Sequence, residues 1–587
     1  MSINNPFRRI WRFLSPYKKQ VFLAIFLQTV SVIASTLEPF IFGLMITELT
    51  ANVVDIMNNV PGAGVNFQYI FGVVGVYLVR GIIFQLGAYG GTYFLTDAVQ
   101  QMIRDIRTEI IEKINKLPVS YFDRHQFGDI LSRITNDVES ISNAFQQSVL
   151  QIVNAIATVL FVTITMFAID WKLSLIILLI IPISAVIARY MISKSQPYFK
   201  DQADVLGDMN GYVQENLTGY EVLKLYNREE RSYEEFEDII SRLNTAGFKS
   251  SFISGLLRPA VSLVSNIVYV IIVLYGGTRV ISGTLTIGNL QAFTQYVYSM
   301  SNPILIITQI VGLIQSASAA ITRVFEVLDF PEEDQSYDKE LELPLTGKVQ
   351  FDDVSFQYTT EKSLIEHFDQ DVEPGQMIAI VGPTGAGKTT MINLLMRFYD
   401  VDEGAILVDG IDIRDLSRQQ YRNQYGMVLQ DTWLFKGSIK DNLRFGNLDA
   451  TDEQVVAAAK ATNIDHFIRT LPNGYDMVVD QDASTISQGQ KQLITIARAL
   501  LSDPRILILD EATSSVDTRL EKLIQDAMDT LMENRTSFVI AHRLSTIQNA
   551  DRILVMDSGH IIESGTHDQL IESRGLYYDL YNSQFEK

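Results

Sequence analysis

The sequence predicts two parts: an α-helical transmembrane domain with six spans and long cytoplasmic extensions, and a C-terminal α/β domain. Three observations predict it. Six long apolar stretches occur before residue 320, and no comparable stretch occurs after residue 330. Beyond residue 349, short β-rich runs such as "VQFDDVSFQY", "MIAIVG", "ILILDEA" and "SFVIAH" alternate with helical stretches, as is typical of an α/β domain. A chain of 587 residues is long enough for two or three domains.

The composition excludes several classes of function. The formal net charge is −21, and a chain this acidic is unsuited to nucleic acid, whose phosphates attract Lys and Arg. The sequence contains no cysteine, so disulfides, thiolate metal sites and cysteine nucleophiles are excluded. The hydrophobic fraction of 47% fits a protein in which membrane segments alternate with soluble sequence.

The six apolar stretches each approach or exceed the ~20 residues that cross a bilayer. They are residues 20–46, 68–95, 147–168, 172–192, 254–277 and 287–315. The basic residues before the first stretch include Lys18 and Lys19. That stretch is too long for a signal peptide, and no small-residue cleavage site closes it. We therefore expect a retained first span with a basic cytoplasmic flank.

The distribution of Lys and Arg predicts the orientation in the membrane. The connection at residues 47–67 contains neither residue type, whereas segments 96–146 and 193–253 contain many. Helical periodicity in these two segments indicates spans that continue beyond the bilayer. We expect both segments and both chain termini in the cytoplasm. The predicted domains are an N-terminal elbow at residues 1–19, a transmembrane domain at 20–329, a linker at 330–348 and an α/β domain at 349–587.

The stretch "GPTGAGKTT" at residues 382–390 fits the phosphate-binding pattern G-x-x-x-x-G-K-[ST]. It follows the apolar run "MIAIV" and precedes the helix candidate "MINLLMRFY", which is the required context; the alternative is a chance glycine-rich turn. The glycines let backbone N–H groups approach phosphates, Lys388 would reach the β- and γ-phosphates, and Thr389 would ligate Mg²⁺. The candidate ATP-binding residues are Gly382, Pro383, Thr384, Gly385, Ala386, Gly387, Lys388, Thr389 and Thr390.

A second, acidic motif supplies the other half of such a site. In "RILILDEATSSVD", four apolar residues end at Asp510, which would hold Mg²⁺ directly or through water. Glu511 follows, in position to polarise an attacking water as a general base. An acidic pair at a strand end can also be a solvated turn. Two halves of one phosphate site in one domain favour a P-loop nucleotide-binding domain.

Together, these motifs resemble those of the ATP-binding cassette (ABC) exporters, and specifically a half-transporter that fuses a transmembrane domain to a nucleotide-binding domain. The resemblance covers essentially the whole chain. It implies that Tyr358 stacks on adenine, that Gln430 contacts Mg²⁺ and the attacking water, and that His542 contacts the γ-phosphate. It also implies that Asp517 in "SSVD" lies at a dimer contact. The turns in "LPVSYFDRHQFGD" and "NLTGYEVLKLYNRE" resemble coupling helices, the second of which docks on the partner's nucleotide-binding domain.

One motif departs from the family pattern. The family signature L-S-G-G-Q is here Ile486-Ser487-Gln488-Gly489-Gln490. In this family two nucleotide-binding domains pair head to tail, so the signature of one chain closes over the ATP held by the other. Gln488 replaces a glycine where close approach matters, so the defect falls on the partner's ATP. This favours a heterodimer with a second ABC half-transporter over a homodimer; the alternative is that Gln488 is tolerated and both sites hydrolyse ATP.

Polar and ionisable residues inside the spans are the candidates for substrate contact. Glu38 and Arg80 either form a structural pair, or Glu38 faces the cavity and attracts cationic substrates. Tyr296, Tyr298 and Asn302 belong to a mixed aromatic and amide lining that suits amphipathic drugs or lipids.

The sequence thus predicts an ATPase coupled to transport, with ATP and Mg²⁺ as cofactors. We expect it to export hydrophobic or amphipathic compounds, as multidrug exporters do, by alternating access. A lipid or lipid-linked flippase shares this mechanism, and an ATP-binding regulatory membrane subunit is the alternative from another class. The expected location is the plasma membrane of a bacterium, as a multi-pass protein in contact with membrane lipid and without nucleic acid.

Overall fold

The computed structural model describes residues 6–334, 337, 345–358, 364–429, 432–479, 486–510, 518–540 and 547–585. The chain forms two compact units, one of Met1–Lys116 and His125–Pro331, the other of Leu117–Arg124 and Glu332–Lys587. The short segment from Leu117 to Arg124 therefore belongs with the C-terminal unit, although the chain on both sides of it belongs to the first.

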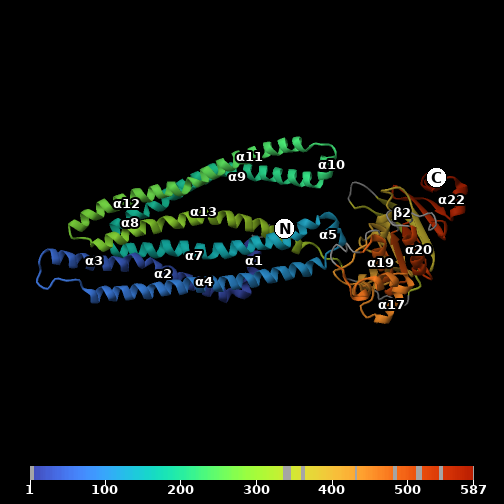
Figure 1. Ribbon diagram of the computed structural model, residues 1–587, viewed down its shortest axis with the longest axis horizontal. Helices are drawn as coiled ribbons and strands as arrows, with labels where there is room; N and C mark the ends of the chain where they lie inside the picture. The colour runs from blue at the N-terminus through green and yellow to red at the C-terminus, as the bar shows by residue number, and fades with distance from the viewer. Residues whose placement is uncertain are drawn as a thin grey trace. The chain divides into compact units, whose positions relative to one another are not determined.

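Over its described residues, the regular secondary structure of the first unit consists of helices (Figure 1). Its helices are α1 (Pro6–Leu14), α2 (Lys18–Thr36), α3 (Glu38–Met57), α4 (Phe67–Ile114), α6 (Phe127–Ser132), α7 (Val138–Ile169), α8 (Trp171–Leu178), α9 (Ile180–Thr218), α10 (Tyr220–Leu225), α11 (Glu229–Gly255), α12 (Leu257–Ile281) and α13 (Ile287–Asp329), with short 3-10 and π turns at Ser15–Tyr17 and Arg133–Asp137. Within the described part of the chain, six helical stretches are long and apolar enough to cross a membrane. This confirms the predicted six-span domain.

Local sequence explains where these helices break. α2 and α3 are separated at Leu37, two residues before Pro39, whose ring nitrogen has no N–H to donate to the preceding turn. α7 and α8 are separated only by Asp170, which is extended and whose side chain accepts hydrogen bonds from the backbone N–H groups of Lys172 and Leu173. Arg279 of α12 forms an ion pair with the same carboxylate. Asp170 therefore caps α8 and also links the α7–α8 turn to α12.

The C-terminal unit is α/β. Its strands are β1 (Val349–Phe356), β2 (Ile365–Val372), β3 (Met377–Val381), β4 (Glu403–Val408), β5 (Ile411–Asp412), β6 (Tyr425–Val428), β7 (Gly437–Ser438), β8 (Val478–Val479), β9 (Ile506–Asp510), β10 (Thr536–Ile540), β11 (Arg552–Asp557) and β12 (His560–Gly565). Its helices are α5 (Val119–Arg124), α14 (Lys388–Leu395), α15 (Arg418–Arg422), α16 (Ile439–Arg444), α17 (Asp452–Ala461), α18 (Asp465–Thr470), α19 (Gln488–Leu501), α20 (Thr518–Met532), α22 (His567–Ser573) and α23 (Leu576–Phe585). The predicted α/β domain is confirmed.

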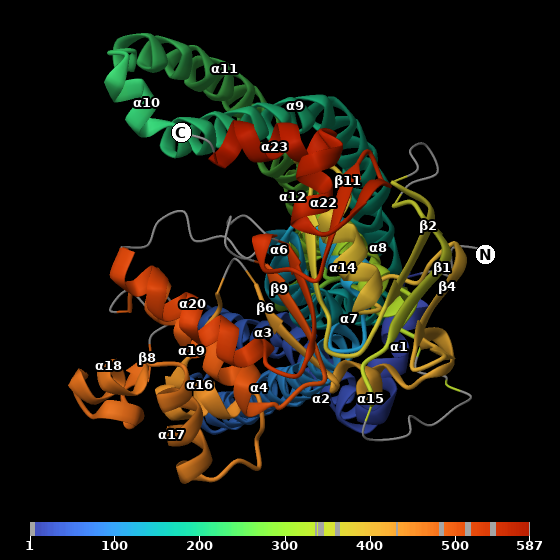
Figure 2. The same ribbon diagram turned by 90° about the vertical axis from the view of Figure 1, so that its right-hand side faces the viewer.

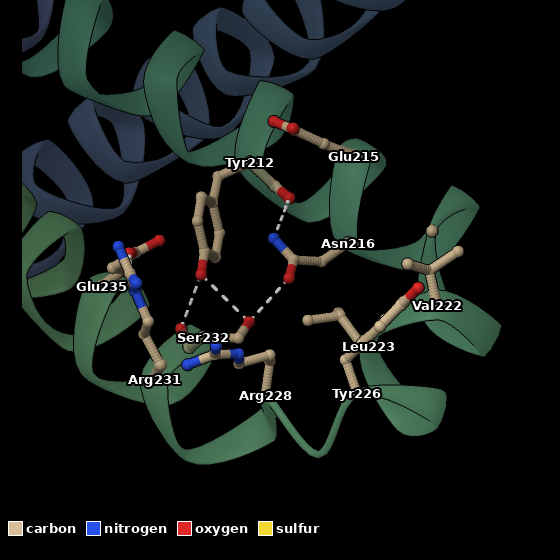
Figure 3. A pocket seen from close by; sticks show the side chains of 11 residues that line it. Tyr212, Glu215, Asn216, Val222, Leu223, Tyr226, Arg228, Arg231, Ser232 and Glu235 are labelled. Carbon is tan, nitrogen blue, oxygen red and sulfur yellow. Dashed lines mark hydrogen bonds and ion pairs between the residues drawn. The ribbon is translucent and has the colours of Figure 1, made fainter.

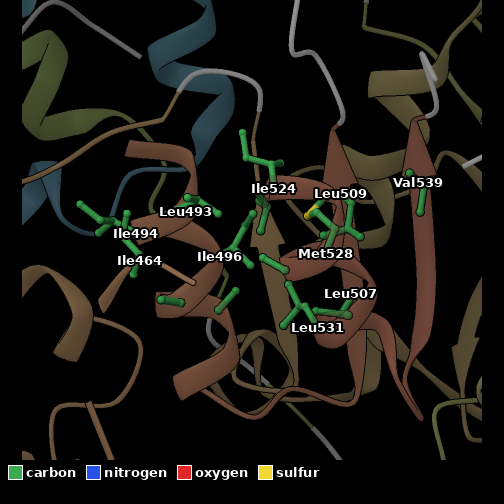
Figure 4. Packing of buried hydrophobic residues seen from close by; sticks show 14 of the residues in the cluster. Ile464, Leu493, Ile494, Ile496, Leu507, Leu509, Ile524, Met528, Leu531 and Val539 are labelled. Atoms are coloured by element: carbon green, nitrogen blue, oxygen red, sulfur yellow. The ribbon is translucent and has the colours of Figure 1, made fainter. Parts of the chain in front are cut away.

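A six-stranded sheet in the order β12-β11-β3-β10-β9-β6 forms the centre of this unit, and all of its strands except β12 run parallel. Parallel strands are covered on both faces and are therefore apolar throughout. In β9, Leu507 and Leu509 pack into one apolar cluster with α19 and α20 (Figure 4). Ile506 and Ile508 pack into another cluster with α14. Figure 2 shows the helices of this unit around the sheet. The sheet register places Ile540 of β10 opposite both Ile380 and Asp510.

Candidate functional site

The register just described brings the two halves of the predicted phosphate site to one edge of the sheet. β3 and β9 flank β10, so the loop after Val381 and the carboxylate of Asp510 both lie at the carboxyl ends of parallel strands. Ligands of open α/β sheets bind at this edge. The sequence pattern alone predicted both motifs but not that one strand separates them.

Glycines in the loop between β3 and α14 occupy positions that other residues fit poorly. Gly387 precedes α14 with φ +101°, a left-handed conformation that other residues rarely adopt. A Cβ atom on Gly382 would overlap the carbonyl oxygen of Met556 on β11. The loop therefore approaches neighbouring backbone closely and leads directly into the N-terminus of a helix, which is the arrangement that receives phosphate groups.

Lys388 is the first residue of α14, and its ammonium group is held by the loop itself. Nζ donates hydrogen bonds to the carbonyl oxygens of Gly382, at 2.7 Å, and Pro383, at 2.9 Å. Burial lowers the pKa of Lys388, and the nearby carboxylate of Asp510 opposes this shift. A partly desolvated cation that donates hydrogen bonds to neutral carbonyl oxygens is a strong potential ligand for phosphate oxygens.

The remaining candidates for phosphate and Mg²⁺ binding in the loop include both exposed and buried residues. Thr389 is exposed at the second position of α14, whereas Thr390 is buried. Pro383, Thr384 and Gly385 are exposed, and Ala386 is buried. Four predicted site residues, Gln430, Glu511, Asp517 and His542, lie outside the described residues, and their roles stay predictions.

Tyr358, the predicted adenine-stacking residue, is held in place by two other aromatic rings. Its ring meets those of Phe356 and Tyr399 edge-on, with centroid distances of 4.9 Å in both cases. Its hydroxyl oxygen accepts a hydrogen bond of 3.3 Å from Nδ2 of Asn393 on α14. Because 36% of Tyr358 stays exposed, the ring is fixed in orientation and still accessible to a stacking partner.

Tyr399 links this aromatic group to α5, a contact that the sequence did not predict. Its hydroxyl donates a 2.5 Å hydrogen bond to Oδ2 of Asp123. Burial, followed by this carboxylate, raises the pKa of Tyr399, so the hydroxyl stays protonated and remains a donor. α5 lies in the turn that resembles the first coupling helix. The C-terminal unit therefore contains a continuous path from the Tyr358 ring to α5.

We expect Tyr399→Phe to loosen α5 while leaving the aromatic packing in place. A hydrogen bond to a carboxylate at a partly exposed site contributes about 1 kcal/mol, so backbone amides of residues 119–124 should exchange with deuterium roughly fivefold faster. The matched control is Tyr475→Phe, which removes another tyrosine–carboxylate bond, 2.6 Å to Asp465, with no contact to α5. Equal exchange rates in the two variants would contradict the proposed link.

The altered signature lies at the start of α19. Ser487 is the N-cap: its side chain accepts from the N–H of Gln490, and the Gln490 side chain accepts from the N–H of Ser487. Gly489 is buried, whereas Ser487 and Gln488 are exposed. Nε2 of Gln488 donates a 3.2 Å hydrogen bond to Oγ1 of Thr432, two residues after the predicted Gln430. The Gln488 side chain is thus held by the segment that follows the predicted Gln430.

The candidate substrate residues in the spans have different surroundings. Glu38 and Arg80 form an ion pair of 2.7 Å, and the hydroxyl of Tyr77 donates a 2.7 Å hydrogen bond to the Glu38 carboxylate. Of the two alternatives, the structure therefore shows the structural pair. Tyr296 is fully buried, with its hydroxyl donating to the carbonyl of Thr36, and the structure does not place it on a cavity wall.

The two remaining candidates for substrate contact, Tyr298 and Asn302, are exposed. Tyr298 is 51% exposed and packs against Tyr269 with a ring-centroid distance of 6.0 Å. Asn302 is also exposed, one turn further along α13. These two residues therefore remain candidates for substrate contact.

A pocket of about 810 Å³ lies at the tip of the second helical extension, where α10 joins α9 to α11 (Figure 3). A closed network braces it: the Tyr212 hydroxyl donates to the backbone oxygen of Ser232, the Ser232 hydroxyl to Asn216, and the Asn216 amide to the backbone oxygen of Tyr212. Val222 and Tyr226 on its rim are exposed. This tip coincides with the sequence that resembles the second coupling helix.

Comparisons with known proteins agree with these features. Residues 21–304 match the family described as "ABC transporter transmembrane region", and residues 365–514 match "ABC transporter". The chain is 44% identical to a fatty acid ABC transporter ATP-binding/permease protein of Mycobacterium bovis, over 89% of this chain and 83% of the relative. It is 34% identical to an ATP-dependent lipid A-core flippase of Desulfotalea psychrophila, over 98% and 99%. A solved structure of a bacterial Atm1-family ABC exporter with ATP bound is similar, with a TM-score of 0.77, 27% identity and coverage of 98% of this chain and 99% of that one.

Proposed function

Because the chain belongs to the ABC transporter family, we propose that it exports amphipathic compounds as one half of a heterodimeric transporter with one degenerate ATP site. The chain is an ABC exporter half-transporter that binds ATP and couples its hydrolysis to transport. The observation that carries the heterodimer is the signature, in which Gln488 stands exposed at the N-terminus of α19.

The described residues of this chain's own loop offer several candidate phosphate ligands. Backbone N–H groups of the loop would face the phosphates, and Lys388 would exchange the carbonyls of Gly382 and Pro383 for phosphate oxygens. The exposed hydroxyl of Thr389 and the carboxylate of Asp510 are hard oxygen donors that fit Mg²⁺, which takes few protein ligands beside phosphates. When bound, Mg²⁺ would neutralise charge on the transferred phosphoryl group. Glu511 is the proposed base.

The opposite site would be built from the partner's loop and this chain's signature. In the pairing proposed here, α19 directs its N-terminus at the partner's ATP, where backbone N–H groups and the helix dipole favour negative charge. Gln488, the first residue of α19, adds a side chain where the phosphate must come close. The defect of Gln488 therefore belongs to the ATP that the partner holds.

We expect Gln488→Gly to tighten ATP binding at the partner's loop about tenfold, which corresponds to roughly one recovered hydrogen bond of 1.4 kcal/mol. Photolabelling with an azido-ATP analogue, followed by separation of the two chains, measures occupancy of each loop. The matched control is Thr432→Val, which removes the hydrogen bond to Gln488 but leaves the signature unchanged. Labelling of the partner that rises equally in both variants, or in neither, would count against the assignment.

The partner itself is identified by purification of the tagged chain from its native membrane and mass spectrometry. We expect a second, related half-transporter that carries an unaltered signature. A lone chain with full transport activity would overturn the heterodimer and favour the alternative in which Gln488 is tolerated.

Amphipathic, lipid-like compounds are the proposed cargo. Two relatives are named for a fatty acid and for the lipid A core, and the exposed Tyr298 and Asn302 offer an aromatic and an amide contact of the kind such molecules use. Reconstituted vesicles test this directly: ATP should drive uphill accumulation of a fluorescent amphiphile, and the amphiphile should stimulate hydrolysis. A regulatory membrane subunit would bind ATP without either response.

The proposed orientation follows the excess of Lys and Arg in the two helical extensions. Both termini and the nucleotide-binding domain would lie in the cytoplasm of a bacterial cell, with the six spans in the plasma membrane. The braced tip formed by α9, α10 and α11 would dock on the partner's nucleotide-binding domain. A cysteine-free chain makes the test simple, since single engineered cysteines report accessibility from each side of the membrane.

A further inference from the structure

A groove of about 520 Å³ lies beside the junction of α1 and α2, far from every residue of the nucleotide site in the sequence. Its lining is Trp11, Lys18, Lys19, Val21, Phe22 and Ile25. Four of these side chains are apolar or aromatic, and the other two are lysines. The groove therefore combines apolar and aromatic surface with two lysines at the start of a membrane span.

The groove does not arise from a loosely attached terminus. Ile10, Phe13 and Leu14 of α1 are buried, and α1 is fastened to the end of α13 by Arg9, whose guanidinium forms two hydrogen bonds of 2.6 and 2.5 Å with Asp329. The same guanidinium lies 3.8 Å from the ring centroid of Phe325. With that face of α1 fixed, Trp11 is held on the other side, 54% exposed.

The spacing along α2 builds the rest of the groove. Lys18, Phe22 and Ile25 recur at i, i+4 and i+7, which places them on one face of the helix. Phe22 is 72% exposed, and the apolar run continues into the first membrane span. An acyl chain that lies parallel to the span would contact this face and would leave the lysine end at the boundary of the bilayer.

The charge of this region differs from that of the whole chain. The first 37 residues contain no Asp or Glu, although the net charge of the protein is −21. Two of the three arginines of α1 have carboxylates nearby, since Arg9 pairs with Asp329 and Arg12 lies 3.8 Å from Glu109. The ammonium groups of Lys18 and Lys19 form no ion pair with any described residue, and both residues are exposed.

From this arrangement we propose that the groove is a binding site for an anionic phospholipid. The phosphate lies between the ammonium groups of Lys18 and Lys19, one acyl chain follows Phe22 and Ile25, and Trp11 closes the groove at the level of the headgroups, where tryptophan is enriched in membrane proteins. Lysine stems cover apolar surface while their charged ends reach the interface, as the site requires. The occupant is a resident lipid that anchors the elbow, and it is not the transported compound.

The test uses the purified full-length transporter, with whatever partner accompanies it, in nanodiscs of phosphatidylcholine. The probe is phosphatidylglycerol with a diazirine on its acyl chain at low mole fraction, compared with the same diazirine on phosphatidylcholine. Crosslinks are mapped by mass spectrometry. We expect crosslinks within residues 11–26 to be several-fold more frequent with phosphatidylglycerol, and Lys18→Gln/Lys19→Gln to remove the preference, since each lysine near an anionic headgroup contributes roughly fivefold.

A variant with the same change in charge distinguishes binding in the groove from general attraction of anionic lipid to a positive surface. Arg8→Gln/Arg12→Gln removes two positive charges from the same elbow without touching the groove lining, so it should keep most of the preference. Equal losses in the two double variants, or equal labelling by the two phospholipids, would overturn the proposal. So would a diazirine fatty acid that displaces the phosphatidylglycerol label in an ATP-dependent manner, because the groove would then hold cargo. Unchanged gel-filtration profiles confirm that all variants remain folded.

Discussion

Lys388→Ala is expected to lower ATP hydrolysis by this transporter by roughly a hundredfold or more, the scale on which single preorganised charge contacts act in transition states. The Lys388 ammonium is partly buried at the start of α14, and its hydrogen bonds within the described part of the chain go to the carbonyl oxygens of Gly382 and Pro383. No other described lysine or arginine lies in the loop at residues 382–390 to replace it. Phosphate release from the purified complex in nanodiscs measures the loss.

Two further variants, Lys348→Ala and Glu511→Gln, serve as controls for Lys388→Ala. Lys348→Ala removes a lysine of the same domain that forms an ion pair of 3.0 Å with Glu373, and it should leave turnover unchanged. Glu511→Gln should also abolish hydrolysis but should retain ATP, because its proposed role is to polarise water. Lys388→Ala should lose both, since its contact is with the phosphates. If Lys388→Ala hydrolysed ATP at the wild-type rate, the loop would not be part of the catalytic site.

The nucleotide site could be predicted because the residues that form it lie close together in the sequence. A strand, a glycine-rich loop and a helix follow one another within twenty residues, and parallel strands must end at a common edge. The S-x-x-Q spacing of Ser487 and Gln490 is likewise a capping-box pattern, and it could have identified the start of α19. Such signals depend only on residues near one another in the chain.

The contacts that were not predicted join distant segments. Tyr399 and Asp123 are 276 positions apart, and nothing in either neighbourhood identifies the other. The relation of Glu38 to Arg80 stayed open for the same reason, because two helices must pack in one specific rotation for the side chains to meet. Tyr296 illustrates a further limit: a membrane helix is apolar on all sides, so its sequence does not show which face is buried.

The second large effect concerns the packing of the spans. Gly288→Ala is expected to destabilise the transmembrane domain by about 1–3 kcal/mol or more, the range for forcing an extra methyl group into a packed site. α3 and α13 cross at Gly43 and Gly288, where a Cβ on Gly288 would overlap the carbonyl oxygen of Gly43. The N–H of Gly288 also donates a 3.2 Å hydrogen bond to Oγ1 of Thr47, which requires the same close approach. Thermal unfolding of the detergent-solubilised protein, followed by gel filtration, measures the change.

Gly312→Ala on the same helix is the control, and it should change stability in the opposite direction. A Cβ at Gly312 would meet no atom within 4 Å, so the substitution only removes conformational freedom from the unfolded chain and should stabilise by about 0.5–1 kcal/mol. Gly43→Ala, whose Cβ would lie 2.5 Å from the carbonyl oxygen of Gly288, should reproduce the loss. The two losses should not add, because either methyl group already separates the helices. Full additivity, or equal stability of Gly288→Ala and Gly312→Ala, would show that the helices do not cross at these glycines.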